Sequence, residues 1–216
     1  MVKIRVPAAP SIRRLPSYLN IIKQAQAEGY DYISGTVIAN ELNLEPIQVR
    51  KDLGITGIVG KPKRGYPVAP LVVAIERFLG WDTKTGAIIV GAGNLATALT
   101  GYPQFKLHGL HFLAAFDISP EKIGTSIHGV PVYAMSEVAA IVQTMGIEIA
   151  VLTVPSTCAQ ETADICMQNG IKGIWNFTNV KIKAQEGVAV QREDLTSGYA
   201  LLSVMLNSRH PSRIKT

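Results

Sequence analysis

The chain has 216 residues, 47% hydrophobic and 17% charged, so it can bury a core in one or two domains and is not a disordered, highly charged chain. The net charge of +5 lies entirely in residues 1–80, which hold eleven Lys and Arg against six Asp and Glu, whereas residues 81–216 hold ten of each. This asymmetry suggests a polyanionic partner, with chance clustering on a solvated face as the alternative. No run of about 18 apolar residues and no signal-like start occurs, which excludes a membrane-spanning helix and favours a cytoplasmic protein.

The first 80 residues are expected to form short helices and a basic hairpin. Pro16 favours the first turn of a helix ending near residue 27, Ser34 can cap a helix over 36–42, and Pro46 can begin a third helix over 47–53. The glycine- and proline-rich segment 54–66 predicts a β-hairpin with a basic tip. The apolar segment 71–79 predicts a fourth helix that leads into the next domain.

This order of elements matches a winged helix-turn-helix, in which the third helix enters the major groove and the hairpin, or wing, contacts backbone or minor groove. Polar side chains on the two elements can contact bases and phosphates, and an aromatic ring can pack on a sugar. The alternative is a small helical cap whose charges are only solvated. The candidate DNA contacts are Gln48, Arg50 and Lys51 on the helix, and Lys61, Lys63, Arg64 and Tyr66 on the wing.

From residue 85 onward, short β-branched runs alternate with helical segments, which predicts a doubly wound parallel sheet. The two cysteines, Cys158 and Cys166, lie about 12 Å apart on one predicted helix, too far for a disulfide. A final apolar helix is expected over residues 195–206. Strands are predicted at 86–90, 111–116, 130–133, 149–154, 173–177 and 188–191, with helices at 94–100, 136–145 and 156–169.

The strongest motif, G-x-G-x-x-A, follows the first of these strands and opens a helix. Gly91 permits the tight turn, Gly93 lets the backbone approach a pyrophosphate, and Ala96 allows close helix–strand packing. Free N–H groups of residues 93–95, at the positive end of the helix dipole, are expected to hold the pyrophosphate. The motif residues Gly91, Ala92, Gly93, Asn94, Leu95 and Ala96 are therefore the candidate cofactor-binding residues.

Asp117 indicates which dinucleotide the motif would take. It ends the next predicted strand, 24 residues after Gly93, where a carboxylate bonds a free ribose diol and repels a 2′-phosphate. NAD(H) is therefore favoured over NADP(H). The alternatives are a Rossmann-like domain that binds no dinucleotide and an Asp117 that serves only as a turn residue.

No catalytic or metal site is expected. A dehydrogenase needs a proton donor or acceptor at the nicotinamide and a domain that holds the substrate. Of the four histidines, three lie in or beside predicted turns or the tail, and His111 begins a strand. No part of the chain is left over for a substrate domain, and the cysteines have no histidine at metal-ligand spacing.

The chain resembles the Rex family of redox-sensing transcriptional repressors over almost its whole length. The resemblance implies a homodimer that represses transcription when NADH is scarce and leaves a palindromic operator when NADH binds, with NAD⁺ as the oxidised form. It also implies that the C-terminal helix swaps into the partner subunit. The matching stretches are Gln48-Val-Arg-Lys-Asp-Leu53, Gly91-Ala-Gly-Asn-Leu-Ala-Thr-Ala-Leu99, Ala114-Ala-Phe-Asp-Ile-Ser-Pro-Glu-Lys-Ile-Gly124, Ile147-Glu-Ile-Ala-Val-Leu-Thr-Val-Pro155, Gly170-Ile-Lys-Gly-Ile-Trp-Asn-Phe177 and the helix near Asp194-Leu195.

By the same resemblance, Tyr102 lies near the nicotinamide, Thr153 and Pro155 belong to the loop beside the cofactor, and Asn176 ends the following strand. Two positions depart from the family. Many members have a wing reading Gly-Thr-Arg-Gly-Val-Gly-Tyr, where this chain has Gly60-Lys-Pro-Lys-Arg-Gly-Tyr66. Asn20 stands where a family arginine can pair with the aspartate that matches Asp194, with Arg13 or Arg14 as possible substitutes.

The expected α/β architecture is thus a winged helix-turn-helix DNA-binding domain in residues 1–80, a Rossmann NAD(H)-binding domain in residues 81–192, and a C-terminal dimerisation helix and tail in residues 193–216. The expected function is a repressor that senses the NADH/NAD⁺ ratio and needs neither a metal nor a membrane. One alternative is a small NAD-dependent oxidoreductase with a helical N-terminal appendage. Its only candidate catalytic acid near the nicotinamide is Tyr102. Another is a nucleotide- or CoA-binding scaffold.

Overall fold

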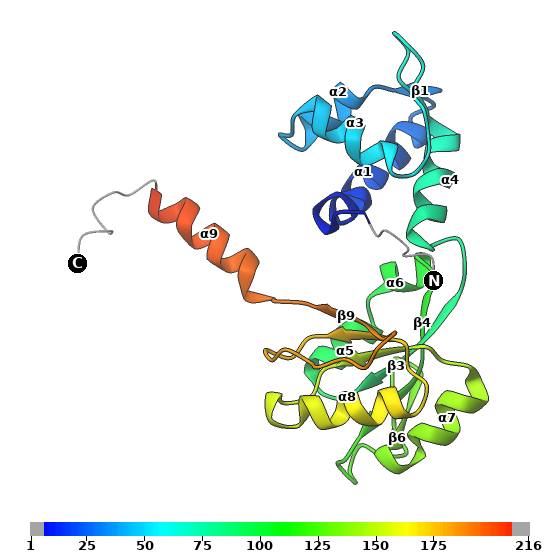
Figure 1. The fold of residues 1–216 in the computed structure, drawn as a ribbon, viewed down its shortest axis with the longest axis vertical. Helices are drawn as coiled ribbons and strands as arrows, with labels where there is room; N and C mark the ends of the chain where they lie inside the picture. Colours follow the sequence, from blue (N-terminus) through cyan, green and yellow to red (C-terminus); the bar gives the residue numbers. More distant parts are fainter. Residues whose placement is uncertain (1–6, 209–216) are drawn as a thin grey trace. The chain divides into compact units, whose positions relative to one another are not determined.

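The computed structural model of the chain describes residues 7–208. The chain divides into two compact units, residues 1–83 and residues 84–216 (Figure 1). The end of the predicted C-terminal segment, residues 209–216, lies outside the described residues. Within the described part, no helix is long and apolar enough to cross a membrane.

The first unit is a small helical core closed by a two-stranded antiparallel sheet. Its largest fully buried side chains include Tyr18, Leu19 and Ile22 from the first helix and Leu71 from the last. In the first helix Leu15, Leu19 and Ile22 recur three to four positions apart, and in the last helix Leu71 and Ile75 do, so one face of each helix supplies the core. The elements are α1 (Ala9–Ala27), β1 (Tyr32–Ile33), α2 (Gly35–Glu41), α3 (Pro46–Gly54), β2 (Tyr66–Pro67) and α4 (Val68–Leu79).

Two local predictions for this unit are wrong. The helix α1 begins at Ala9, with Pro10 in its first turn, and Pro16 lies inside it. Proline at that position removes one backbone hydrogen bond, and burial of the surrounding helix face outweighs the loss. The wing is a tight loop with a single bridge between Lys61 and Gly65, and β2 pairs with β1 instead of with the other arm of a hairpin.

The second unit confirms the doubly wound parallel sheet. Its seven strands are ordered β5-β6-β4-β3-β7-β8-β9, and all neighbouring pairs are parallel except β5 with β6. The order reverses direction at β3, which lies between β4 and β7, and ligands of such sheets bind at this switch point. The strands are β3 (Thr85–Val90), β4 (Leu110–Asp117), β5 (Ser126–Ile127), β6 (Val130–Ala134), β7 (Ile149–Leu152), β8 (Gly173–Asn176) and β9 (Ala189–Arg192).

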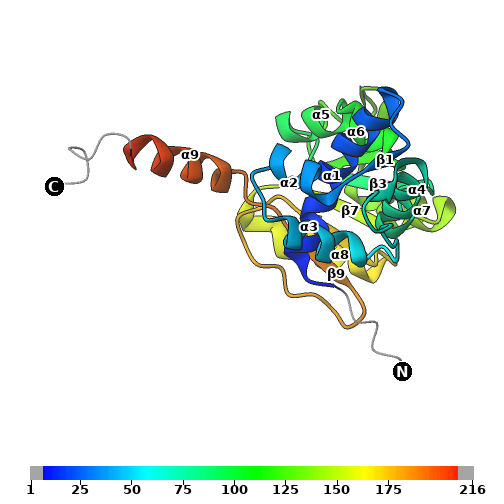
Figure 2. The ribbon, with the colours of Figure 1, turned by 90° about the horizontal axis from the view of Figure 1, so that it is seen from above.

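Helices cover both faces of this sheet. The helices α5 (Asn94–Thr100) and α6 (Pro103–Leu107) lie on one side of β3 and β7, and α8 (Ala159–Gln168) lies on the other (Figure 2). The helix α7 (Val138–Met145) shares the α8 side, where Val142 and Ala163 pack in one buried cluster. Short 3₁₀ turns, η1 (Met135–Glu137) and η2 (Ser156–Cys158), precede α7 and α8.

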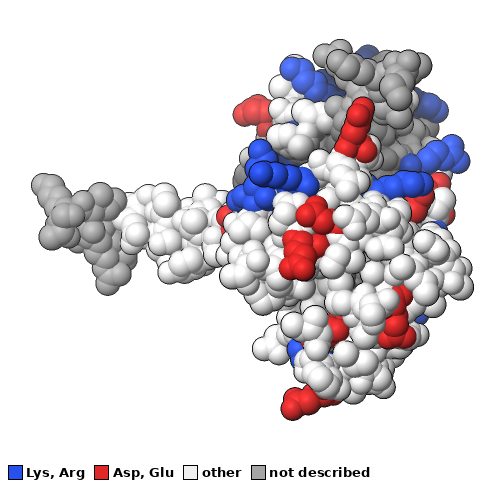
Figure 3. Space-filling view, turned by 60° about the horizontal axis from the view of Figure 1, so that its bottom comes forward, with Lys and Arg blue, Asp and Glu red and all other residues white. Residues whose placement is uncertain are grey.

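The last helix, α9 (Thr196–Ser208), buries none of its residues in this chain. Tyr199 is 73% exposed and Leu202 53% exposed, and five more large apolar side chains on or beside the helix are exposed by half or more. No residue of α9 is charged, so its surface is white throughout the space-filling view (Figure 3). Exposed apolar area of this extent marks a surface that another molecule covers.

Candidate functional site

The glycine-rich turn joins the carboxyl ends of three strands. The Gly91 N–H donates to the Phe116 carbonyl at 2.8 Å, and the Thr153 hydroxyl donates to the Gly91 carbonyl at 2.8 Å. Gly91 has φ of +97°, and a Cβ at this position would lie 2.9 Å from the Thr153 carbonyl oxygen. Only glycine satisfies both conditions, which agrees with the role predicted for the first glycine of the motif.

Gly93 and Ala96 differ in what surrounds them. A Cβ built on Gly93 meets no atom within 4 Å, so its backbone is open to a ligand, whereas Ala96 is fully buried beside Ile89 and Ala115. The prediction of a free Gly93 N–H is wrong, because this group donates to the Gly91 carbonyl at 2.9 Å and closes the turn. The N–H groups of Asn94 and Leu95, in the first turn of α5, have no acceptor within the helix and are the candidate anion donors.

Asp117 lies beside this turn at the end of β4. Its carboxylate accepts hydrogen bonds from the Ala92 N–H at 2.7 Å, the Ile118 N–H at 2.8 Å and the Ser119 N–H at 2.9 Å, and from the Lys122 ammonium at 3.1 Å. Burial acts to raise the pKa of Asp117, but the hydrogen bonds from Ser119, Lys122 and Ala92 lower it below its ordinary value. The carboxylate is therefore charged at neutral pH and fixed in place.

These contacts determine how a ribose could fit. A carboxylate has about four acceptor positions, and four donors from the described part of the chain use them. Three are backbone groups of fixed loops, and the fourth is Lys122, whose side chain is 44% exposed. A ribose diol can thus reach Asp117 by sharing or replacing the Lys122 contact. Sequence reasoning missed Lys122, although it lies five residues after Asp117 in the same motif.

Tyr102, expected near the nicotinamide, lies immediately before α6 and is 52% exposed. Its ring meets Phe105 edge to face at 5.2 Å, Phe105 meets Trp175 at 5.3 Å, and Trp175 meets Phe177 at 4.9 Å. The rings form a continuous aromatic cluster from α6 to the end of β8. An apolar ring of a ligand placed against Tyr102 would extend this cluster.

The remaining predicted cofactor residues occupy the same edge of the sheet with different roles. Thr153 binds the glycine turn, and Pro155 is exposed in the loop after β7. Asn176 is fully buried, and its amide donates to the Val180 carbonyl at 2.9 Å and accepts from Thr178 at 2.6 and 2.9 Å. Its side chain therefore holds its own loop.

In the first unit, the predicted recognition helix α3 is anchored by a buried carboxylate. Asp52 accepts hydrogen bonds from the Arg14 guanidinium at 2.7 and 3.1 Å, the Tyr18 hydroxyl at 2.7 Å and the Gln48 amide at 2.8 Å. Burial acts to raise the pKa of Asp52, but hydrogen bonds from Arg14, Tyr18, Ser11 and Gln48 lower it to about 2. The network joins α3 to α1, and sequence reasoning gave Asp52 and Tyr18 no role.

The predicted DNA contacts on α3 are therefore not equivalent. Gln48 is half-buried and held by Asp52, while Arg50 and Lys51 are exposed, with the Arg50 guanidinium donating to the Pro46 carbonyl at 3.2 Å. Arg14, one of the suggested partners for Asp194, pairs with Asp52. Asp194 instead accepts from the Thr196 N–H and hydroxyl.

On the wing, Lys61, Lys63 and Arg64 are exposed as predicted, but Tyr66 is only 8% exposed. Its ring belongs to the core of the first unit, so the prediction that it packs on a nucleic-acid sugar is not supported by its position. A strand of two residues gives no alternation from which burial could be predicted. No group of three or more His, Cys, Asp or Glu that could hold a metal occurs among the described residues.

Comparison with known proteins covers both units. Residues 82–180 match a family model described as a CoA binding domain, and residues 5–54 match one described as the N-terminus of a putative DNA-binding protein. The redox-sensing transcriptional repressor Rex of Treponema denticola is 60% identical over 97% of this chain and 100% of its own length. The Rex repressor of Bacteroides fragilis is 38% identical over 92% of this chain and 89% of its own length.

Solved structures agree over the whole length. RSP, a Rex-family repressor, has been solved in complex with β-NAD⁺ and operator DNA. That structure has a TM-score of 0.87, is 30% identical, and covers 96% of each chain. RSP in complex with β-NADH has the same TM-score at 29% identity, covering 97% of this chain and 99% of its own.

Proposed function

The chain belongs to the Rex family of redox-sensing transcriptional repressors, and from this premise we propose how its two units make DNA binding depend on NADH. It is a transcriptional regulator and not an enzyme, which removes the oxidoreductase and scaffold alternatives. The observation that carries the proposal is the full-length similarity to RSP, a protein solved with NAD⁺ and operator DNA and also with NADH.

The second unit is proposed to seat the dinucleotide on the glycine turn. When bound, the cofactor supplies a nicotinamide ring that is cationic in the oxidised form and neutral in the reduced form. The open backbone at Gly93 and the N–H groups of Asn94 and Leu95 suit the pyrophosphate, and Asp117 suits the ribose of NAD(H). The preference for the neutral, reduced ring is proposed to come from its burial in a pocket beside Tyr102 and the apolar α9 of the partner chain, because burial costs more for the charged, oxidised ring.

The first unit is proposed to bind operator DNA through α3 and the wing. Arg50 and Lys51 are exposed on the helix, where they can grip phosphates or read base edges. The cations of the wing neutralise further phosphates, which gives affinity without sequence preference. The Asp52 network fixes α3 on α1, so the helix presents these side chains from a rigid support.

A second copy of the chain is proposed to cover α9. An uncharged helix with Tyr199 and Leu202 exposed is not stable in water, and a homodimer buries it. A two-fold dimer also matches a palindromic operator, because each DNA-binding unit then meets one half-site. Because a repressor acts directly on DNA, the protein is also proposed to be cytoplasmic.

NADH releases the operator only if it binds more tightly to the dimer that is free of DNA. Linkage is reciprocal, so saturating operator must weaken NADH binding by the same factor by which NADH weakens operator binding. The experiment is a gel shift on a palindromic site titrated with NADH and, separately, with NAD⁺. Release by NADH and not by NAD⁺ supports the proposal, and equal retention with both refutes it.

A further inference from the structure

Tyr32 holds the two outer cations of the wing. The Lys61 ammonium donates to the Tyr32 hydroxyl at 3.0 Å and lies 5.4 Å from the centre of its ring. The Arg64 guanidinium lies 5.5 Å from the same centre. The hydrogen bond from Lys61 lowers the pKa of Tyr32 below its ordinary value. One phenol thus contacts both ends of the basic loop through its hydroxyl and its ring.

Backbone pairing fixes Tyr32 beneath the wing. Tyr32 lies opposite Pro67 and Ile33 opposite Tyr66 in the antiparallel pair of β1 and β2, and Ile33 is buried. A Cβ on Gly65, at the end of the wing, would come within 2.4 Å of the Ile33 carbonyl oxygen. The end of the wing therefore lies in close backbone contact with β1, the strand that carries Tyr32.

The wing loop itself is tightly turned. The Lys61 N–H donates to the Gly65 carbonyl at 2.7 Å, and the Gly65 N–H donates back to the Lys61 carbonyl at 3.0 Å. Lys63 has φ of +61°, in the left-handed region that favours glycine and disfavours a lysine. Lys61 and Arg64, the two cations that Tyr32 contacts, therefore lie at the two ends of this turn.

We propose that Tyr32 is a positioning residue for DNA binding, which holds Lys61 and Arg64 as a preformed pair of cations for the phosphate backbone. The inference rests on the proposed function of the wing. Two neighbouring cations repel, and each long side chain loses rotamer freedom when it grips a phosphate. The ring offsets the repulsion through its negative face, and the hydroxyl oxygen accepts a hydrogen bond from the Lys61 ammonium. Less side-chain entropy is then lost when the wing binds DNA.

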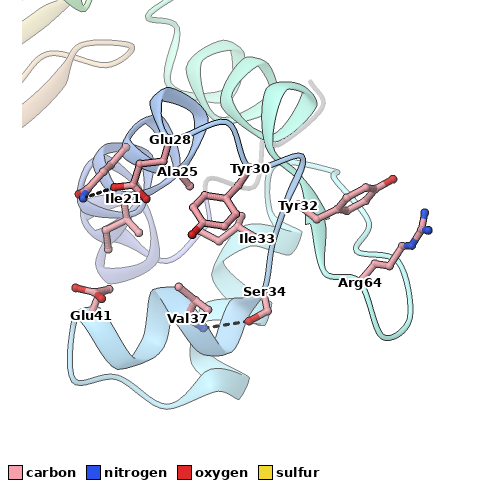
Figure 4. Close-up of a pocket in the computed structure, with 11 residues that line it drawn as sticks. Ile21, Ala25, Glu28, Tyr30, Tyr32, Ile33, Ser34, Val37, Glu41 and Arg64 are labelled. Carbon is pink, nitrogen blue, oxygen red and sulfur yellow. Dashed lines mark hydrogen bonds between the residues drawn. The ribbon is translucent and has the colours of Figure 1, made fainter.

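The position of Tyr32 argues against a role in the core. Its side chain is half-exposed and stands outside the buried cluster of the first unit, although its neighbour Ile33 belongs to it. Tyr30 provides a matched control, because it is a tyrosine two residues away and 59% exposed. Figure 4 shows Tyr32 beside Arg64 at the wing, whereas Tyr30 points the other way, toward α1 and α2.

The test compares salt dependence of DNA binding among full-length variants. Tyr32→Ala removes no charge, so the affinity for specific and random duplexes should fall roughly tenfold while the slope of affinity against salt stays that of the wild type. Lys61→Ala should instead flatten the slope by about one. Tyr32→Phe, which keeps the ring, should lose a smaller factor, and Tyr30→Ala should bind like the wild type.

A Lys61→Ala/Arg64→Ala background completes the cycle, because Tyr32→Ala should cost nothing further there. Any of three results would overturn the inference. Tyr32→Ala could bind DNA as tightly as the wild type, or its affinity could depend less steeply on salt. Tyr32→Ala could also lower DNA affinity as much in the Lys61→Ala/Arg64→Ala background as in the wild type. Should Tyr32→Ala fail to fold, Tyr32→Phe with the same background decides the question. A wild-type protein that binds no duplex would refute the proposed function itself, whereas binding that ignores Tyr32 would refute only the inference.

Discussion

Replacement of Asp52 by asparagine tests the electrostatic support of the recognition helix. Asp52 is completely buried and accepts hydrogen bonds from Arg14, Tyr18 and Gln48. Asp52→Asn keeps the size of the side chain, removes its charge and places an amide donor among three donors. The variant therefore loses the ion pair and leaves at least one donor unpaired.

The magnitude follows from the pKa. A pKa lowered from 3.8 to about 2 corresponds to about 2 kcal/mol of folding free energy at neutral pH. The side chain of Arg14 is 29% exposed and can regain water, so the cost stays below the roughly 3–5 kcal/mol of breaking a fully buried pair. Because the folded-state pKa is depressed, this stabilisation is present above about pH 4 and is lost as the pH falls through 2.

The assay is hydrogen exchange of α1 and α3 peptides in increasing urea, which reports on the first unit separately from the second. We expect Asp52→Asn to lower the free energy of unfolding of the first unit by about 2–3 kcal/mol at pH 7. The difference in this free energy between wild type and variant should narrow below pH 4. Glu76→Gln, which breaks the more exposed pair with Lys23 in the same unit, should cost about 1 kcal/mol or less. A loss below 0.5 kcal/mol in Asp52→Asn, or a gap independent of pH, would refute the reasoning.

Three further predictions concern the cofactor, the dimer and the wing. Gly91→Ala forces a methyl group to 2.9 Å from the Thr153 carbonyl oxygen. Fluorescence titration should therefore show at least a tenfold loss of NADH affinity, while the variant still binds the operator. Normal NADH affinity would contradict the role assigned to the turn. Leu202→Glu places a charge on the exposed apolar face of α9, so sedimentation should show monomers, which no longer bind the palindromic site. An intact dimer would show that α9 is not part of the interface. Lys63→Gly removes the strain of a lysine in the left-handed region and should stabilise the first unit by about 1 kcal/mol in thermal unfolding. It also removes one cation, so the slope of log affinity for DNA against log salt should fall by about one. An unchanged slope would exclude Lys63 as a phosphate contact.

The parts of the fold that could be predicted from the sequence are those with local patterns. The inner strands β3 and β7 are continuous apolar runs, and the motif around Gly91 combines a turn, a strand end and a helix start within nine residues. The contacts of the glycine turn with Thr153, 62 residues away, required the sheet order. The short helix α6 went unpredicted because five residues carry no periodicity.

The support of the DNA-binding side chains could not be predicted from local pattern. Asp52 and Arg14 are 38 residues apart, and Tyr32 meets Lys61 across 29 residues. Within α3, however, a signal was present: Asp52 lies between Val49 and Leu53 on the buried face, and a carboxylate there needs a cation. Such a residue in a basic segment predicts a structural ion pair, although spacing along the chain does not identify the cation.

The dependence of operator binding on the reduced cofactor is tested most directly by measuring both halves of the linkage on one preparation. Operator affinity is measured by fluorescence anisotropy with and without saturating NADH, and NADH affinity is measured with and without saturating operator. We expect the two ratios to be equal and well above one, with a much smaller effect of NAD⁺. An NADH affinity that saturating operator leaves unchanged would contradict this expectation.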